Sequence, residues 1–107
     1  MKIAVLQLDI IWEDWQANRA KVRAFAEEAA RAEAELLLLP EMSMFGFSMN
    51  VAKLAKWEKD ICQFFQSLSI EYQLAIGFGY VNENREGLGV NHYALAVKGE
   101  IIADYQK

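Results

Sequence analysis

Glu41 is the residue of this sequence that is best placed to do chemistry. It follows the apolar run at residues 36–39 and Pro40, a pattern that predicts a buried strand stopped by the proline. Ligand crevices in open α/β sheets form at the carboxyl ends of strands, where this glutamate would lie. Desolvation by nearby apolar side chains would raise the pKa of its carboxyl and favour a proton acceptor; these neighbours are Met42, Met44, Phe45 and Phe47. A solvated loop glutamate is the alternative interpretation.

Cys62 and His92 have side chains that could react or bind a metal, but both have simpler explanations. Cys62, the single cysteine, lies in a predicted helix, whereas reactive cysteines usually lie at helix N-termini or beside cations. We therefore expect a packed structural thiol and keep a reactive Cys62 as an alternative. His92, the single histidine, has no Cys, Asp or second His at ligand spacing, which favours a polar strand residue over a metal ligand. Gly77-Phe78-Gly79 is too short for a phosphate loop, so we expect no nucleotide and no other cofactor.

The first half of the chain predicts the elements that position Glu41. Residues 2–10 have apolar side chains on both faces, which is typical of a strand between two layers. Residues 16–34 predict an amphipathic helix, with apolar residues at helical spacing at Val22, Phe25, Ala26, Ala29 and Ala32. With the strand at residues 36–39, this order implies a parallel pair joined by a right-handed crossover.

The second half predicts another helix and three strands. The helix covers about residues 51–71, with Ser48 or Asn50 as its N-cap. Its apolar stripe consists of Leu54, Trp57, Ile61, Phe64, Phe65 and Leu68. A strand at residues 73–81, with close backbone approach at its glycines, precedes a hairpin of residues 90–98 and 100–105. The order β-α-β-α-β-β-β predicts a layered α/β fold.

The length, charge and apolar content of the chain limit the classes of protein to which it could belong. A chain of 107 residues allows one domain, and its formal charge of -4 lacks the positive surface that nucleic acid requires. The apolar runs are far shorter than the roughly 20 residues that span a bilayer, which excludes a membrane protein. One cysteine and no visible secretion signal fit a cytoplasmic protein. An apolar fraction of 54% is high for so short a chain, so either the chain buries its apolar residues unusually well or part of its partner surface lies outside these residues.

Several pieces of the chain, in the right order, resemble the nitrilase or carbon-nitrogen hydrolase superfamily. The segment Leu39-Pro40-Glu41-Met42, followed by Gly46-Phe47-Ser48-Met49, looks most like the omega-amidase branch, which hydrolyses small linear amides. Tyr105-Gln106-Lys107 matches the tyrosine-x-lysine signature of the superfamily. The other matching residues are Gln7, Asn18 and Asn91.

The resemblance implies a four-layer α-β-β-α sandwich and a glutamate, lysine and cysteine triad acting on a small amide. Glu41 would be the general base that takes the thiol proton, and Lys107 would stabilise the oxyanion of the tetrahedral intermediate. An amide is a poor electrophile, so its hydrolysis needs a thiolate, a base and a cation near the developing charge. A thioester forms, ammonia leaves, and water then attacks.

The nucleophilic cysteine of the superfamily follows the lysine, and this sequence ends at Lys107. A further glutamate from the later half of the superfamily is also not present. We therefore interpret residues 1–107 as the N-terminal part of a carbon-nitrogen hydrolase domain, inactive alone. Exposed sheet surface would make it a homo-oligomer, domain-swapped or prone to aggregate. The alternative is a non-catalytic, small α/β binding or interaction domain.

Overall fold

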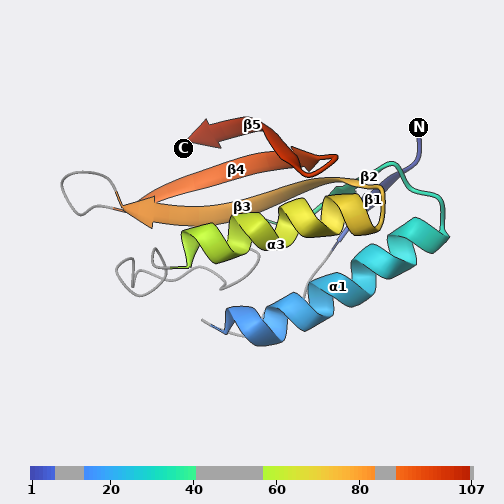
Figure 1. The fold of residues 1–107 in the computed structure, drawn as a ribbon, viewed down its shortest axis with the longest axis horizontal. Helices are drawn as coiled ribbons and strands as arrows, with labels where there is room; N and C mark the ends of the chain where they lie inside the picture. Colours follow the sequence, from blue (N-terminus) through green and yellow to red (C-terminus); the bar gives the residue numbers. More distant parts are fainter. Residues whose placement is uncertain (7–13, 41–56, 84–88, 107) are drawn as a thin grey trace.

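The computed structural model describes residues 1–6, 14–40, 57–83 and 89–106 (Figure 1). In these ranges the chain forms two helices and one five-stranded sheet, the mixed α/β architecture that the sequence predicts. The elements are β1 (Ile3–Val5), α1 (Trp15–Arg31), β2 (Leu36–Leu38), α3 (Glu58–Glu71), β3 (Ala75–Glu83), β4 (Gly89–Val97) and β5 (Glu100–Gln106). None of the helices in these ranges is both long and apolar enough to cross a membrane.

The order of the strands in the sheet, β1-β2-β3-β4-β5, is the same as their order in the chain. β1, β2 and β3 are parallel, β4 is antiparallel to β3, and β5 is antiparallel to β4. β1, β2, β3 and β5 therefore all finish at the same end of the sheet, which we call the carboxyl end. The predicted hairpin is confirmed: β4 and β5 join at Lys98 and Gly99, whose positive φ angles of 51° and 83° suit a two-residue turn.

Helix α1 begins at Trp15 because the Asp14 carboxylate accepts a hydrogen bond from the Ala17 amide at 3.1 Å. Its buried residues are Trp15, Asn18, Val22, Ala26 and Ala29. Phe25 is 39% exposed although it continues the apolar spacing. Successive helical residues are about 100° apart, so Phe25 lies beside the line that faces the sheet while Ala26 lies on it.

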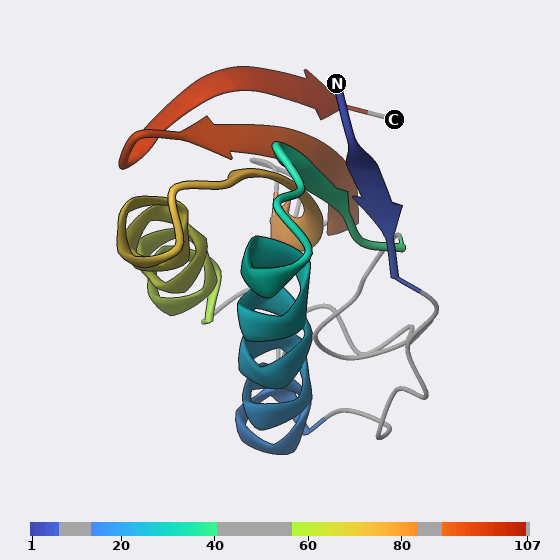
Figure 2. The same ribbon diagram turned by 90° about the vertical axis from the view of Figure 1, so that its right-hand side faces the viewer.

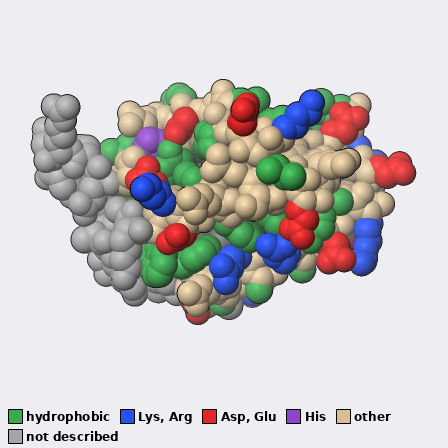
Figure 3. Space-filling model, in the orientation of Figure 1, with side chains coloured by type: hydrophobic (Ala, Val, Ile, Leu, Met, Phe, Trp, Pro, Cys, Tyr) green, Lys and Arg blue, Asp and Glu red, His purple; other side chains and the backbone are tan. Residues whose placement is uncertain are grey.

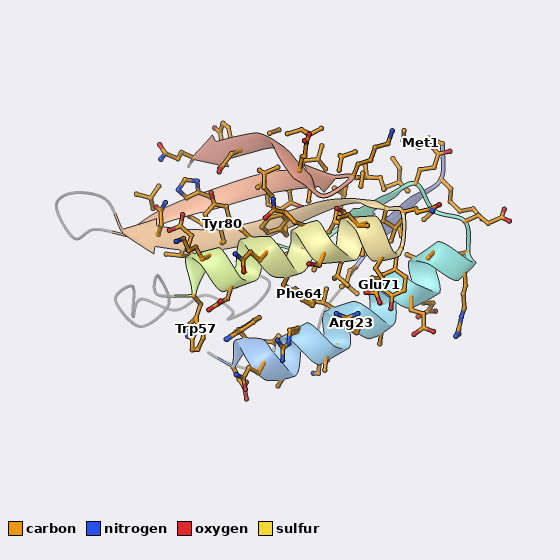
Figure 4. The ribbon with its side chains drawn as sticks, in the orientation of Figure 1. Met1, Arg23, Trp57, Phe64, Glu71 and Tyr80 are labelled. Carbon is orange, nitrogen blue, oxygen red and sulfur yellow. The ribbon has the colours of Figure 1, made fainter. Side chains whose placement is uncertain are left out.

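Helix α3 packs its predicted apolar stripe against β3. Ile61, Phe64, Phe65 and Leu68 are buried, and the ring of Phe65 stacks on Phe78 of β3 at 4.3 Å between centroids. A half-exposed ion pair of 2.6 Å between Arg23 of α1 and Glu71 of α3 connects the two helices at their surface (Figure 4). The predicted start of this helix at residue 51, and its caps Ser48 and Asn50, lie outside the described residues.

Both helices cover the same face of the sheet, and no described element covers the opposite face (Figure 2). The register places Val5, Leu38, Leu95 and Ala103 on this uncovered face, and Tyr93 and Tyr105 pair on it further along. Val5 is 71% exposed and Tyr105 is 66% exposed. The outer surface of the helices instead carries charges of both signs (Figure 3). Among the described residues, the uncovered face therefore contributes exposed apolar surface.

Candidate functional site

The two predicted catalytic residues, Glu41 and Lys107, lie outside the described residues, but each directly follows a described segment. Pro40 precedes Glu41 after β2, and Gln106 is the last residue of β5. Because β2 and β5 run in the same direction, both segments finish at the carboxyl end of the sheet. β3 and β4 lie between them, so the strands are three spacings apart, or roughly 14 Å.

Tyr93 of β4 makes a side-chain hydrogen bond to the backbone at the end of β2. Its hydroxyl donates a hydrogen bond of 2.7 Å to the carbonyl of Leu39, on the uncovered face. Burial raises the pKa of Tyr93, which keeps the hydroxyl protonated and able to donate. A Cβ at Gly77 would lie 2.9 Å from both the Tyr93 hydroxyl and the Leu38 side chain. The predicted close approach at Gly77 is confirmed. Because this glycine has no side chain, the Tyr93 ring can extend over β3 to reach the Leu39 carbonyl.

A second polar cluster lies on the helix side of the sheet and contains His92. The His92 side chain is buried, with Nδ1 2.8 Å from Oδ1 of Asp104 and Nε2 3.0 Å from Oδ1 of Asn82. The hydroxyl of Tyr80 donates to the other oxygen of Asp104, and the Tyr80 and His92 rings stack at 4.6 Å. Figure 4 shows Tyr80 on β3 above α3. Burial, reinforced by the Asp104 carboxylate, raises the pKa of Tyr80 above its ordinary range.

Spacing along the chain could not reveal this cluster. Tyr80, His92 and Asp104 come from three different strands, and they share a face only in the observed register. His92 does lie on a strand as predicted, but its acidic partner is twelve residues away on the next strand. In the described ranges, no group of three or more His, Cys, Asp or Glu side chains is arranged to hold a metal. An open hollow of about 540 Å³ beside Glu35, Ala75 and Lys98 lies away from the carboxyl end.

Cys62 is half-buried in the middle of α3, as predicted for a structural thiol. Burial, with a smaller contribution from Glu58 and Asp104, raises the pKa of the thiol to about 11. Only the thiolate is a nucleophile, so we expect this cysteine to react slowly near neutral pH.

Alkylation of Cys62 by iodoacetamide at pH 7 is therefore expected to be slow. A thiol that titrates near 11 instead of 9.0 is about a hundredfold less ionised at neutral pH. The labelling rate should rise as the pH approaches 11, and the urea-unfolded protein should react at the rate of a free cysteine. Equal rates for folded and unfolded protein at pH 7 would show that Cys62 is a reactive thiol.

Comparison with known proteins places the chain in a family. The carbon-nitrogen hydrolase family model matches residues 2–107. The chain belongs to the carbon-nitrogen hydrolase family. The match confirms the family that the LPEM and tyrosine-x-lysine segments predict. Of the other residues on which the resemblance rests, Asn18 is buried on α1 and Asn91 lies on β4, while Gln7 is outside the described residues.

Relatives of this carbon-nitrogen hydrolase chain include amidases. The chain is 30% identical, over all its residues, to omega-amidase YafV from Yersinia enterocolitica, and covers 41% of that protein. It is 27% identical over 99% of its length to the glutamine-dependent NAD(+) synthetase of Acinetobacter baylyi, and covers 20% of it. All of the chain superposes on 42% of an amidase from Nesterenkonia sp. AN1 in complex with butyramide, with a TM-score of 0.89 and 28% identity. The chain thus spans about two fifths of the length of these amidases, and their fold confirms the predicted class.

Proposed function

We propose that the protein to which this chain belongs is an amidase that hydrolyses small linear amides through a glutamate, lysine and cysteine triad. Glu41 and Lys107 would come from these residues, and the cysteine from a later part of the protein. Membership of the carbon-nitrogen hydrolase family and the similarity to two amidases support this proposal. The structural observation that carries it is that β2 and β5 finish at the same end of one sheet.

The proposed reaction has two halves, formation of a thioester and its hydrolysis, and Glu41 transfers protons in both. Glu41 accepts the proton of the thiol, and the resulting thiolate attacks the carbonyl carbon of the amide. The ammonium of Lys107 stabilises the negative charge that develops on the carbonyl oxygen. Glu41 returns the proton to the leaving nitrogen, and ammonia departs from the thioester. Glu41 then removes a proton from water, which attacks the thioester and releases the carboxylic acid and the thiol.

The uncovered face of the sheet is the side on which we place this chemistry. Tyr105 is on that face, and strand alternation carries the residue two positions further, Lys107, to the same side if β5 continues. The hydrogen bond from Tyr93 to Leu39 lies on the same side, just before Pro40 and Glu41. Both proposed groups would therefore meet a substrate held against this face.

Variants of the relative from Nesterenkonia support the assignment of residue types. Structures of that amidase exist in which one cysteine is replaced by serine, and in which a glutamate is changed to glutamine together with the cysteine. The second of these is a complex with acrylamide. The proposed function assigns the same two residue types, glutamate and cysteine, to the reaction of this protein.

The uncovered face also supports a proposal about association. Because the relatives are more than twice as long, we propose that later residues of the protein cover this face as a further layer. Residues 1–107 alone are then expected to form homo-oligomers, domain-swapped dimers or aggregates, since apolar surface around Val5 and Tyr105 remains in water. Light scattering measures this directly. A monodisperse monomer at micromolar concentration would contradict the expectation.

The test of the proposed function is ammonia release from small amides by the full-length protein. Butyramide, acrylamide and glutamine are suitable substrates, because the amidase from Nesterenkonia sp. AN1 forms complexes with butyramide and acrylamide and the NAD(+) synthetase relative is glutamine-dependent. We expect release of one ammonia for each carboxylic acid formed, and no release by residues 1–107. Absence of turnover by the full-length protein with every small linear amide would favour the non-catalytic binding domain instead.

A further inference from the structure

We propose that Tyr80, His92 and Asp104 form a positioning network that sets the register of β5 and thereby the placement of Lys107. The proposal rests on the proposed function, which gives Lys107 its role at the oxyanion. None of the three side chains needs to touch the substrate, because they lie on the helix side of the sheet. They would act through the strand that ends at Lys107.

β5 needs such a network because little else holds it in place. Among the described strands it is the last of the sheet and pairs with β4 on one side only. Its residues 102–106 are all exposed, so packing against the other described elements contributes little to its position. The register with β4 also shifts between Leu95 and Ala96, so the two-residue turn at Lys98 and Gly99 does not by itself fix the pairing beyond this point.

Asp104 is the side chain of β5 that distinguishes the observed register from a slipped one. It pairs with Ala94, whose small side chain lets the carboxylate reach beyond β4 to Tyr80 on β3. A slip of one residue would turn Asp104 to the uncovered face. The buried His92 and Tyr80 would then each lose a charge-assisted hydrogen bond. The cost of these unpaired groups selects the observed register.

The network is completed by groups on the other elements packed around it. Asn82 of β3 accepts from His92 through Oδ1, and its amide nitrogen lies 3.4 Å from Glu58 of α3. Glu58 thereby fixes the orientation of the Asn82 amide, and both ring nitrogens of His92 face oxygen atoms. The half-buried thiol of Cys62 is the other titratable group of α3 in this region.

The connection to Lys107 follows from strand geometry. Residues 104 and 107 are an odd number of positions apart, so a continuous strand presents them on opposite faces, about 10 Å apart along the chain. If β5 continues past Gln106, the register that brings Asp104 to His92 and Tyr80 would therefore direct residue 107 to the uncovered face. Oxyanion stabilisation is sensitive to displacements of about 1 Å, so loosening the end of β5 should reduce catalysis.

The experiment is a double-mutant cycle in the full-length protein with an amide that it hydrolyses. Tyr80→Phe removes one hydroxyl and keeps the ring stack, and Asp104→Asn keeps the shape and removes the charge. We expect each to lower kcat about tenfold with KM changed less than about twofold, because the lost interaction is made in the transition state. In the Lys107→Ala background the same changes should lower kcat less than about twofold, because their effect passes through Lys107.

A matched control separates positioning from loss of stability. Ile61→Val removes one methylene from the same helix and sheet layer and should lower Tm comparably while keeping the wild-type kcat. Equal losses of kcat with and without Lys107, or a wild-type kcat in Tyr80→Phe and Asp104→Asn, would overturn the positioning proposal alone. Full activity of Lys107→Ala would overturn the proposed triad as well, and the single variant reveals that outcome directly.

Discussion

Replacement of Lys107 by alanine in the full-length protein is expected to lower kcat for amide hydrolysis by about 10²- to 10³-fold, with little change in KM. The range is that of a lost oxyanion stabiliser, which acts when the carbonyl oxygen becomes negative and not when the neutral amide binds. Glu41→Gln should lower kcat by about 10²- to 10⁴-fold, because glutamine cannot accept the thiol proton. Initial rates of ammonia release over a range of amide concentrations measure both parameters.

Controls of the same residue types are available on exposed positions of the helices. Lys59→Ala on α3 and Glu28→Gln on α1 remove the same charges from side chains in water, and should leave kcat and KM unchanged. Thermal unfolding shows whether each variant retains the fold. Wild-type kcat in Lys107→Ala or in Glu41→Gln would remove that residue from the proposed mechanism.

Truncation of Phe65 is expected to cause the largest loss of stability of any single core change, about 3–5 kcal/mol in the free energy of unfolding. The ring is fully buried between α3 and β3 and contacts two other aromatic rings, Phe64 at 5.1 Å and Phe78 at 4.3 Å between centroids. Phe65→Ala would leave a cavity in the layer on which the sheet depends. Denaturant unfolding followed by far-UV circular dichroism measures the change.

Phe25→Ala is the matched control, because it removes the same ring from α1, where 39% of the residue is already exposed. We expect it to cost about 1 kcal/mol, in line with substitutions at partly exposed sites. A loss for Phe65→Ala as small as that for Phe25→Ala would show that the helix layer is not the main source of stability.

The sequence predicted the elements well where one periodicity dominates. The run at residues 36–39 predicted β2, which the structure describes as Leu36–Leu38, and Lys98-Gly99 predicted the hairpin turn. The predicted helix at residues 16–34 is α1, three residues shorter at its end. These features are set by residues close together in the chain, so the pattern of a single sequence is enough to predict them.

The candidate site was predictable only in part, because its parts depend on strand register. Family motifs pointed to Glu41 and Lys107, and Gly77 signalled the close approach that Tyr93 uses. The contact between His92 and Asp104 was missed, since it depends on an irregular pairing near Ala96 that local spacing does not encode. Pairs across strands require the three-dimensional register before they can be recognised.

The strands lie side by side in the same order as they occur in the chain, which bears on how the protein folds during translation. Each strand after β1 pairs with a strand made before it, so the described helix and sheet layer can assemble in step with translation. In that layer the side of the sheet that includes Val5 and Tyr105 is exposed to solvent. Chaperones that shield the hydrophobic surface of nascent chains would be expected to bind on this side.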